Sequence, residues 1–201
     1  MQILSANDPA ALDSALKILY SHDGVMLAPT ETVYGLLCAE SSNAAKERIY
    51  QLKQRDKNKL LANFVPEIRT VLDFVPEIPE TAQRFAQRFC PGPITIVIPD
   101  GDGGTFGFRI PDHPFILALL KAYGKAIAST SANLSGEKAA LSVPQAMESL
   151  AGETDLAIDG GVIPEGSPAS TVVLVNKDNS WRILRPGPVT EDMLKRSLAV
   201  S

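Results

Sequence analysis

The chain has 201 residues, of which 45% are hydrophobic and 21% charged, and its formal net charge is −4. This composition excludes a disordered chain, a collagen-like chain and a disulfide scaffold, because two cysteines are too few for a disulfide framework. Proteins that bind nucleic acid non-specifically are usually basic, so the acidic balance leaves only a local patch for such a role.

Hydrophobic periodicity and capping residues predict helices and strands that alternate along the chain. Helices are expected between Asp8 and Gly24, after Ser42 or Asn43, at residues 68–72, 80–90 and 114–124, from Ser142 to residue 151, and after Thr190. Strands are expected at residues 25–28, 60–65, 94–98, 105–110, 126–129, 156–159, 170–176 and 181–184.

The order of these elements predicts a mixed α/β sheet with flanking helices. A glycine-rich turn at residues 100–104 joins two strands as a hairpin, so the sheet should contain antiparallel as well as parallel pairs. No repeat or linker interrupts the chain, which indicates one domain over residues 1–201. Polar loops at residues 29–36, 129–137 and 160–169 follow expected strands, where ligands collect in open α/β sheets.

Two polar segments have open interpretations. Residues 53–59 hold four cations, which can be a solvated helix end that complements the dipole or a phosphate site. Residues 129–136 gather hydroxyls and an amide, which can cap a turn or hold phosphate and ribose oxygens. Spacing alone does not decide between these alternatives.

Metal and membrane sites are not predicted. H-E-x-x-H and C-x-x-C spacings are absent from the sequence, so His22 and His113 are expected to be satisfied surface histidines. Cys38 and Cys90 are expected to be small core residues. No apolar run approaches the roughly 18 residues of a membrane helix, so we expect a cytoplasmic protein without membrane contact.

Several short strings stand in a specific order along the chain: PTETVYGL at residues 29–36, KQR at 53–55, CPGPITIV at 90–97, FRIPDHP at 108–114, STSANLSG at 129–136 and LRPGPVT at 184–190. Together they resemble the YrdC-like family of threonylcarbamoyl-adenylate synthases over about residues 10–195. The resemblance implies a single YrdC-like domain with a twisted mixed sheet around a concave basic cavity, without the additional C-terminal domain of longer members.

The resemblance also implies a reaction. L-threonine, bicarbonate and ATP would give threonylcarbamoyl-AMP, pyrophosphate and water, and transferase partners would use the adenylate to make N6-threonylcarbamoyladenosine in tRNA. ATP would bring Mg²⁺, which keeps few protein ligands, so no tightly bound metal is expected. The alternative is a YrdC-like paralogue that acts as an RNA-binding module without synthase activity, with weak RNA binding given the acidic balance.

The resemblance implies a role for each residue that matches a position of the family motifs. The residues expected to bind ATP and the adenylate are Lys53, Arg55, Ser131, Asn133, Ser170 and Arg185. Lys53 and Arg55 would also be the catalytic cations. The residues expected around threonine are Thr30, Thr32, Tyr34 and Arg109, with Arg109 as the carboxylate clamp. Asp56 and Leu37 depart from the family pattern, which carries Pro and Gly there.

The strand at residues 105–110 supports the role of Arg109. Alternation along a strand places Phe106, Phe108 and Ile110 on one face and Thr105, Gly107 and Arg109 on the other. The first face should pack on the core, and the second leaves space for a ligand beside the guanidinium. Without the resemblance, an exposed arginine on an outer strand is an equal alternative.

Overall fold

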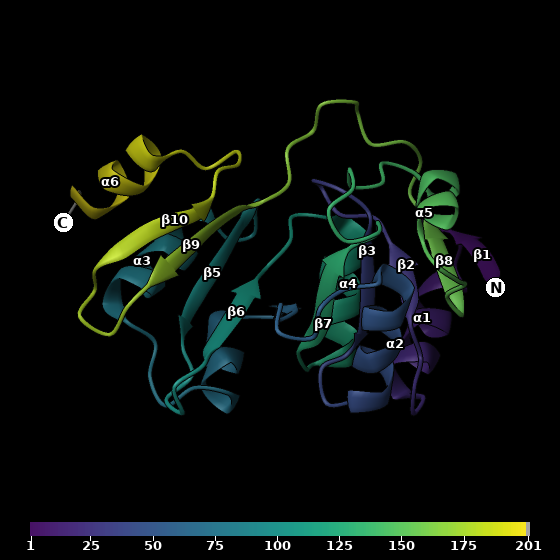
Figure 1. Cartoon of the computed structure of the whole chain (residues 1–201), viewed down its shortest axis with the longest axis horizontal. Helices are drawn as coiled ribbons and strands as arrows, with labels where there is room; N and C mark the ends of the chain where they lie inside the picture. The colour runs from purple at the N-terminus through teal and green to yellow at the C-terminus, as the bar shows by residue number, and fades with distance from the viewer. Residues whose placement is uncertain (200–201) are drawn as a thin grey trace.

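The computed structural model describes residues 1–199 and shows a mixed sheet with the strand order β1-β8-β2-β3-β7-β4-β6-β5-β9-β10 (Figure 1). The strands are β1 (Gln2–Ser5), β2 (Met26–Ala28), β3 (Gly35–Ala39), β4 (Ala62–Phe64), β5 (Ile94–Pro99), β6 (Thr105–Arg109), β7 (Ile127–Ser131), β8 (Leu156–Asp159), β9 (Thr171–Val175) and β10 (Trp181–Arg185). The helices are α1 (Ala11–Tyr20), α2 (Asn43–Lys53), η1 (Ile68–Asp73), α3 (Glu80–Phe89), α4 (Pro114–Tyr123), α5 (Val143–Ser149) and α6 (Glu191–Ala199).

The sheet contains both parallel and antiparallel pairs, which confirms the predicted mixed α/β class. Strands β1 and β2 both run parallel to β8, and β4–β6 and β5–β9 are parallel as well. The hairpin β5–β6 is antiparallel, as the glycine-rich turn predicted, and so are β2–β3, β3–β7, β4–β7 and β9–β10.

Two strands lie outside the predicted set. Strand β3 was expected to be partly loop, yet all five of its residues are buried between β2 and β7. Its sequence, GLLCA, has no alternation because both faces are covered, so periodicity gave no strand signal there. Strand β1 is a mostly exposed edge strand whose pairing with β8 is decided by the fold.

Local capping signals are mostly confirmed. The Ser42 hydroxyl accepts the Ala45 N–H at 3.0 Å and begins α2, and the Ser142 hydroxyl accepts the Gln145 N–H at 3.3 Å and begins α5. The Thr190 hydroxyl accepts the Met193 N–H at 3.3 Å at the start of α6. These bonds satisfy N–H groups that have no partner within the helix.

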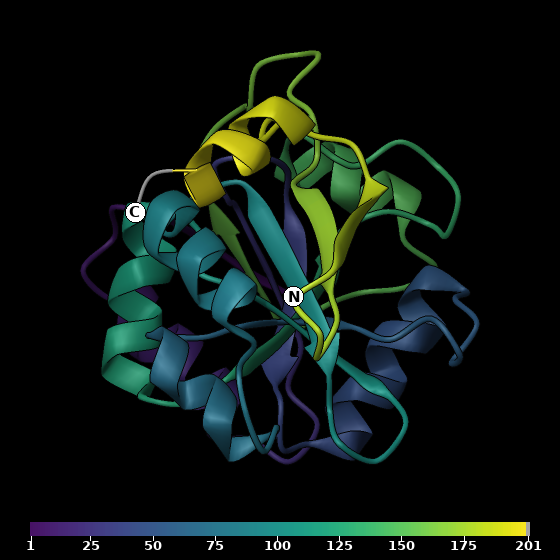
Figure 2. The same ribbon diagram turned by 90° about the vertical axis from the view of Figure 1, so that its left-hand side faces the viewer.

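Helices cover both faces of the sheet and leave part of it open. In Figure 2, α3 and α4 lie on one side of the sheet, and α2 and α5 lie on the other. One core cluster joins α3 and α6 to β5, β6 and β9 through residues such as Phe85, Ile96 and Phe108. The opposite face of β5 and β6, which carries Thr95 and Arg109, lines a cavity. The sheet therefore supplies a core on one side and a site on the other.

Candidate active site

Figure 1 shows the sheet in two parts, one with β5, β6, β9 and β10 and the other with β1, β2, β3, β7 and β8. A cavity of about 450 Å³ lies where these two parts meet, and its lining comes from strands β3 to β7, β9 and β10. Three arginines line it, Arg55, Arg109 and Arg185, together with the hydroxyls of Thr30 and Thr32 in the loop after β2 and of Ser129, Thr130 and Ser131 in β7. Among the described residues that line the cavity there is no Asp or Glu. The loop between β8 and β9 arches over the middle of the sheet in Figure 1, and its last two residues, Ala169 and Ser170, are also in the lining.

The loop after β2 is held rigid by its two threonines. The Thr30 hydroxyl donates to the Val33 carbonyl at 2.7 Å and accepts the Val33 N–H at 3.1 Å. Because that hydroxyl has one proton, the Thr32 hydroxyl must donate in the 2.9 Å contact between Thr32 and Thr30. The oxygen of Thr32 in turn accepts a bond from Arg109 Nη2 at 3.1 Å. One continuous chain of hydrogen bonds therefore runs from Arg109 into this loop.

Tyr34 lines the cavity and joins this loop to the chain after β8. Its hydroxyl donates to the Gly161 carbonyl at 2.7 Å and accepts the Gly160 N–H at 3.0 Å. Burial raises the pKa of Tyr34, and the Gly160 N–H opposes that shift. The phenol therefore stays protonated at neutral pH and positions two loops of the site.

Lys53 is buried behind the cavity wall. The side chain is 1% exposed and is absent from the cavity lining, so the solvated interpretation of residues 53–59 is wrong at this position. Its Nζ donates to the carbonyl oxygens of Ser131 and Asn133, the latter at 2.7 Å. Burial, together with the nearby Arg55 charge, lowers the pKa of Lys53 to about 8. The lysine thus ties the KQR string to the loop after β7.

Asn133 is buried, so the expectation of a surface loop at this residue is wrong. Its Nδ2 donates to the carbonyls of Leu134 at 2.7 Å and Glu137 at 3.0 Å, and its Oδ1 is buried without a partner among the described residues. The neighbouring Ser131 lines the cavity. Ser131 therefore faces the ligand space, and the Asn133 side chain stabilises the loop behind it.

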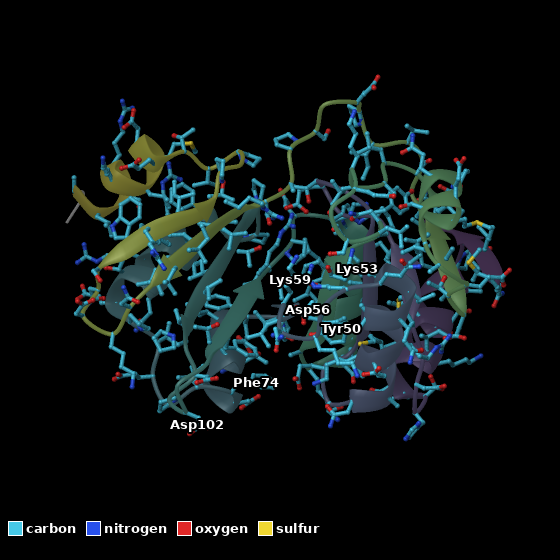
Figure 3. The ribbon with its side chains drawn as sticks, viewed as in Figure 1. Tyr50, Lys53, Asp56, Lys59, Phe74 and Asp102 are labelled. Atoms are coloured by element: carbon cyan, nitrogen blue, oxygen red, sulfur yellow. The ribbon has the colours of Figure 1, made fainter. Side chains whose placement is uncertain are left out.

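The segment after α2 places Arg55 in the cavity and leaves its neighbours in solvent. Arg55 Nε and Nη2 donate to the carbonyls of Lys59 and Leu60, both at 3.1 Å. Lys57 pairs with Glu47 at 2.8 Å and is 67% exposed, as a solvated helix end predicts. Asp56 is exposed, and its carboxylate accepts the Asn58 N–H at 2.9 Å. Figure 3 shows Lys53, Asp56 and Lys59 close together between the two parts of the sheet.

Strand β6 confirms the predicted alternation. Phe106 and Phe108 are buried in the core, whereas Thr105, Gly107 and Arg109 line the cavity. Arg109 is 5% exposed, so the outer-strand alternative is wrong. The second departure from the family pattern, Leu37, is fully buried in β3 and packs in the core.

Arg185 and Ser170 form one unit at the opposite wall. Arg185 Nη2 donates to the Ser170 carbonyl at 2.7 Å and to the Ser170 hydroxyl oxygen at 3.1 Å. That hydroxyl also lies 2.9 Å from the Thr95 hydroxyl. Burial lowers the pKa of Arg185, and the charge of Arg109 lowers it further. Both cations line the same cavity.

Sequence reasoning missed Glu31 and the buried nitrogen of His113. Glu31 lies within the PTETVYGL string and pairs with Arg109, and neither its acidic character nor its position marked it as part of a site. His113 was expected to be a satisfied surface histidine, which is wrong, because its Nδ1 is buried without a partner among the described residues. Burial lowers the pKa of His113, and the Glu31 charge opposes this.

Comparison with known proteins places this site in a family. The Sua5/YciO/YrdC family model, described as telomere recombination, matches residues 19–187. The chain belongs to the Sua5/YciO/YrdC family. The predicted resemblance is thereby confirmed, and the family strings are the segments that line or support the cavity.

Relatives within the family agree in sequence and fold. Threonylcarbamoyl-AMP synthase of Bacillus subtilis is 33% identical over 96% of this chain and 57% of its own length. A crystal structure of P. abyssi Sua5 complexed with L-threonine matches with a TM-score of 0.84 and 28% identity, over 93% of this chain and 57% of that one. The crystal structure of E. coli YciO matches with a TM-score of 0.78 and 25% identity, over 94% of this chain and 96% of that one. The chain spans between about half and two thirds of the length of the curated relatives it matches.

Two further findings concern residues 1–199. Within them, no three His, Cys, Asp or Glu side chains gather as metal ligands. No helix in this part of the chain is long and apolar enough to cross a membrane.

Proposed function

We propose that this chain synthesises threonylcarbamoyl-AMP from L-threonine, bicarbonate and ATP, with release of pyrophosphate and water. Relatives named threonylcarbamoyl-AMP synthase support this proposal, as does the match to a family member complexed with L-threonine. The observation that carries it is the cavity, whose described lining has three arginines and no carboxylate. We infer a positive potential there, which suits a site where phosphate and carboxylate groups must lie side by side.

The chemistry divides into two steps. The threonine ammonium group first loses its proton, and the free amine then attacks the carbon of bicarbonate, which gives a carbamate and releases water. A carbamate oxygen then attacks the α-phosphorus of ATP, and the bond to the pyrophosphate oxygen breaks. Neither step needs a nucleophile from the protein, so catalysis rests on positioning the reactants and on cations near the developing phosphate charge.

The walls of the cavity suit the two substrates. Arg109, with Thr30, Thr32 and Tyr34, would hold threonine, since a guanidinium grips a carboxylate through parallel hydrogen bonds. ATP with its Mg²⁺ would be held by other residues of the lining, namely Arg55, Ser131, Ser170 and Arg185. Lys53 and Asn133 would act by fixing the end of β7, where Ser131 lies, and the loop that follows it. The catalytic role falls mainly on Arg55, with Lys53 behind it.

The product is a mixed anhydride, so it must pass quickly to a protein that transfers the threonylcarbamoyl group. We propose that this partner is a tRNA-modifying transferase in the cytoplasm. The assignment of residues 1–201 to one domain stays a prediction. We do not favour the RNA-binding alternative, because the named relatives and the arginine-lined cavity both support a small-molecule site.

Pyrophosphate release tests the proposal. We expect release from ATP only when threonine and bicarbonate are both present, and we expect labelled bicarbonate to enter an adenylate separable by chromatography. Release at full rate without threonine would overturn the proposal. Tight tRNA binding with a steep salt dependence, combined with no pyrophosphate release, would support the alternative.

A further inference from the structure

Arg109 and Glu31 form a buried ion pair at the wall of the cavity. Arg109 Nη2 lies 2.6 Å from Glu31 Oε1, and the two side chains are 6% and 19% exposed. Both carboxylate oxygens of Glu31 are buried, and neither accepts a well-aligned hydrogen bond from the described residues. Glu31 therefore supplies a negative charge to Arg109 without directing its N–H groups.

Other contacts direct those N–H groups. Arg109 Nε donates to the Gly92 carbonyl at 3.2 Å, and Nη2 donates to the Thr32 hydroxyl at 3.1 Å. The ring of Phe64 lies beside the guanidinium, with its centroid 5.9 Å from the central carbon. No described residue accepts a hydrogen bond from Nη1. Because Arg109 lines the cavity, Nη1 is the group that remains for a ligand.

The other titratable groups near Glu31 do not compete for its charge. Burial lowers the pKa of His113, so its imidazole is neutral at pH 7. Burial raises the pKa of Cys90 to about 11, so its thiol is neutral as well. Arg109 is thus the cation that balances Glu31, and Glu31 is the anion that balances Arg109. A buried ion pair that loses one partner leaves an uncompensated charge, which is strongly unfavourable.

We propose that Glu31 is a positioning residue that keeps Arg109 in the cavity wall with Nη1 free for the carboxylate of the amino-acid substrate. This inference rests on the proposed function. Without the Glu31 charge, the buried guanidinium would leave its place in the cavity wall. Threonine binding should therefore depend on Glu31 even though Glu31 is not in the cavity lining.

Binding measurements on the full chain test this role. Titration calorimetry with L-threonine alone and with ATP alone compares the wild type with Glu31→Gln, which removes the charge and keeps the shape. We expect the threonine Kd to rise at least tenfold and the ATP Kd to change less than twofold. Glu40→Gln is the matched control, because Glu40 pairs with Lys46 at 3.1 Å with 24% exposure and lies outside the cavity lining. Its threonine Kd should not change.

A thermal-unfolding cycle tests the coupling to Arg109. Glu31→Gln and Arg109→Gln each leave one buried charge unpaired, whereas the double variant removes both. We expect the double variant to lose less melting temperature than the sum of the single variants. If Glu31→Gln does not fold, Glu31→Asp keeps the charge but withdraws it by one methylene, and its threonine Kd should still rise at least threefold.

The outcomes separate this inference from the proposed function. If the wild type binds no threonine, both fail. If the wild type binds threonine and Glu31→Gln binds it equally well, the positioning role alone is overturned. Additive losses in the melting-temperature cycle would also overturn it, because they would show that Glu31 does not act through Arg109.

Discussion

Lys53 Nζ donates a hydrogen bond to the carbonyl oxygen of Asn133, 2.7 Å away, and so ties the end of α2 to the loop after β7. The Ser135 N–H returns a bond to the Lys53 carbonyl at 2.9 Å. The two strings KQR and STSANLSG are thereby one structural unit. Arg55 and Ser131 both line the cavity. Their relative positions are fixed by Lys53 and Asn133, which are buried and lie outside the cavity lining.

The buried amine should make stability depend on pH. Burial lowers the pKa of Lys53 from 10.5 to about 8, so between these values the unfolded chain binds more protons than the folded chain. Relative to Lys53→Met, the wild type should therefore gain stability as the pH rises from 8 to 10.5, by roughly 3 kcal/mol in total. Urea unfolding of both proteins at several pH values measures this difference. A difference that stays constant over this range would show that the lysine titrates normally.

Arg55 should contribute to ATP binding far more than its neighbour Lys57. Loss of a desolvated charge costs about 2 kcal/mol or more, so Arg55→Ala should weaken ATP binding or slow turnover by about 30-fold. Lys57→Ala is the control, since its exposed pair with Glu47 contributes little. Calorimetry with ATP and a turnover assay compare the two. Wild-type ATP affinity and turnover in Arg55→Ala would show that residues 53–59 form a solvated surface without a binding role.

Asn133→Ala should reduce both stability and ATP affinity. The variant leaves the carbonyls of Leu134 and Glu137 without their amide donor, at a cost of about 1–3 kcal/mol, or several degrees of melting temperature. ATP affinity should fall because the loop that follows Ser131 is no longer fixed. Thermal unfolding and ATP calorimetry measure the two effects. A lower melting temperature with unchanged ATP affinity would show that this loop does not bind the nucleotide.

Arg109→Lys should keep the charge in the wall and lose the fork of donors. Lysine cannot bind the Gly92 carbonyl, the Thr32 hydroxyl and a substrate carboxylate at once with the same geometry. The threonine KM should rise tenfold or more, which is about 1.4 kcal/mol, while ATP binding without threonine stays the same. Steady-state kinetics at saturating ATP give the value. An unchanged threonine KM would remove Arg109 from the carboxylate site.

The sequence by itself determined the features that depend on near neighbours. Alternation along residues 105–110 placed Arg109 opposite Phe106 and Phe108, and the structure has this arrangement. The hydroxyls of Ser42 and Ser142 begin helices because capping joins residues three apart. The motif strings identified the family and the segments around the cavity, because their order is written in the chain.

Only the tertiary structure decided which polar side chains face ligand and which support the wall. Strand β3 carries no periodic signal because both of its faces are buried, and β1 is a strand only through its pairing with β8. Lys53 and Asn133 are 80 residues apart in sequence, and their contact exists because α2 packs against β3, which pairs with β7. The burial of Glu31 next to Arg109 likewise needs β2 and β6 in one sheet. Burial and charge pairing depend on such distant contacts, and local spacing does not encode them.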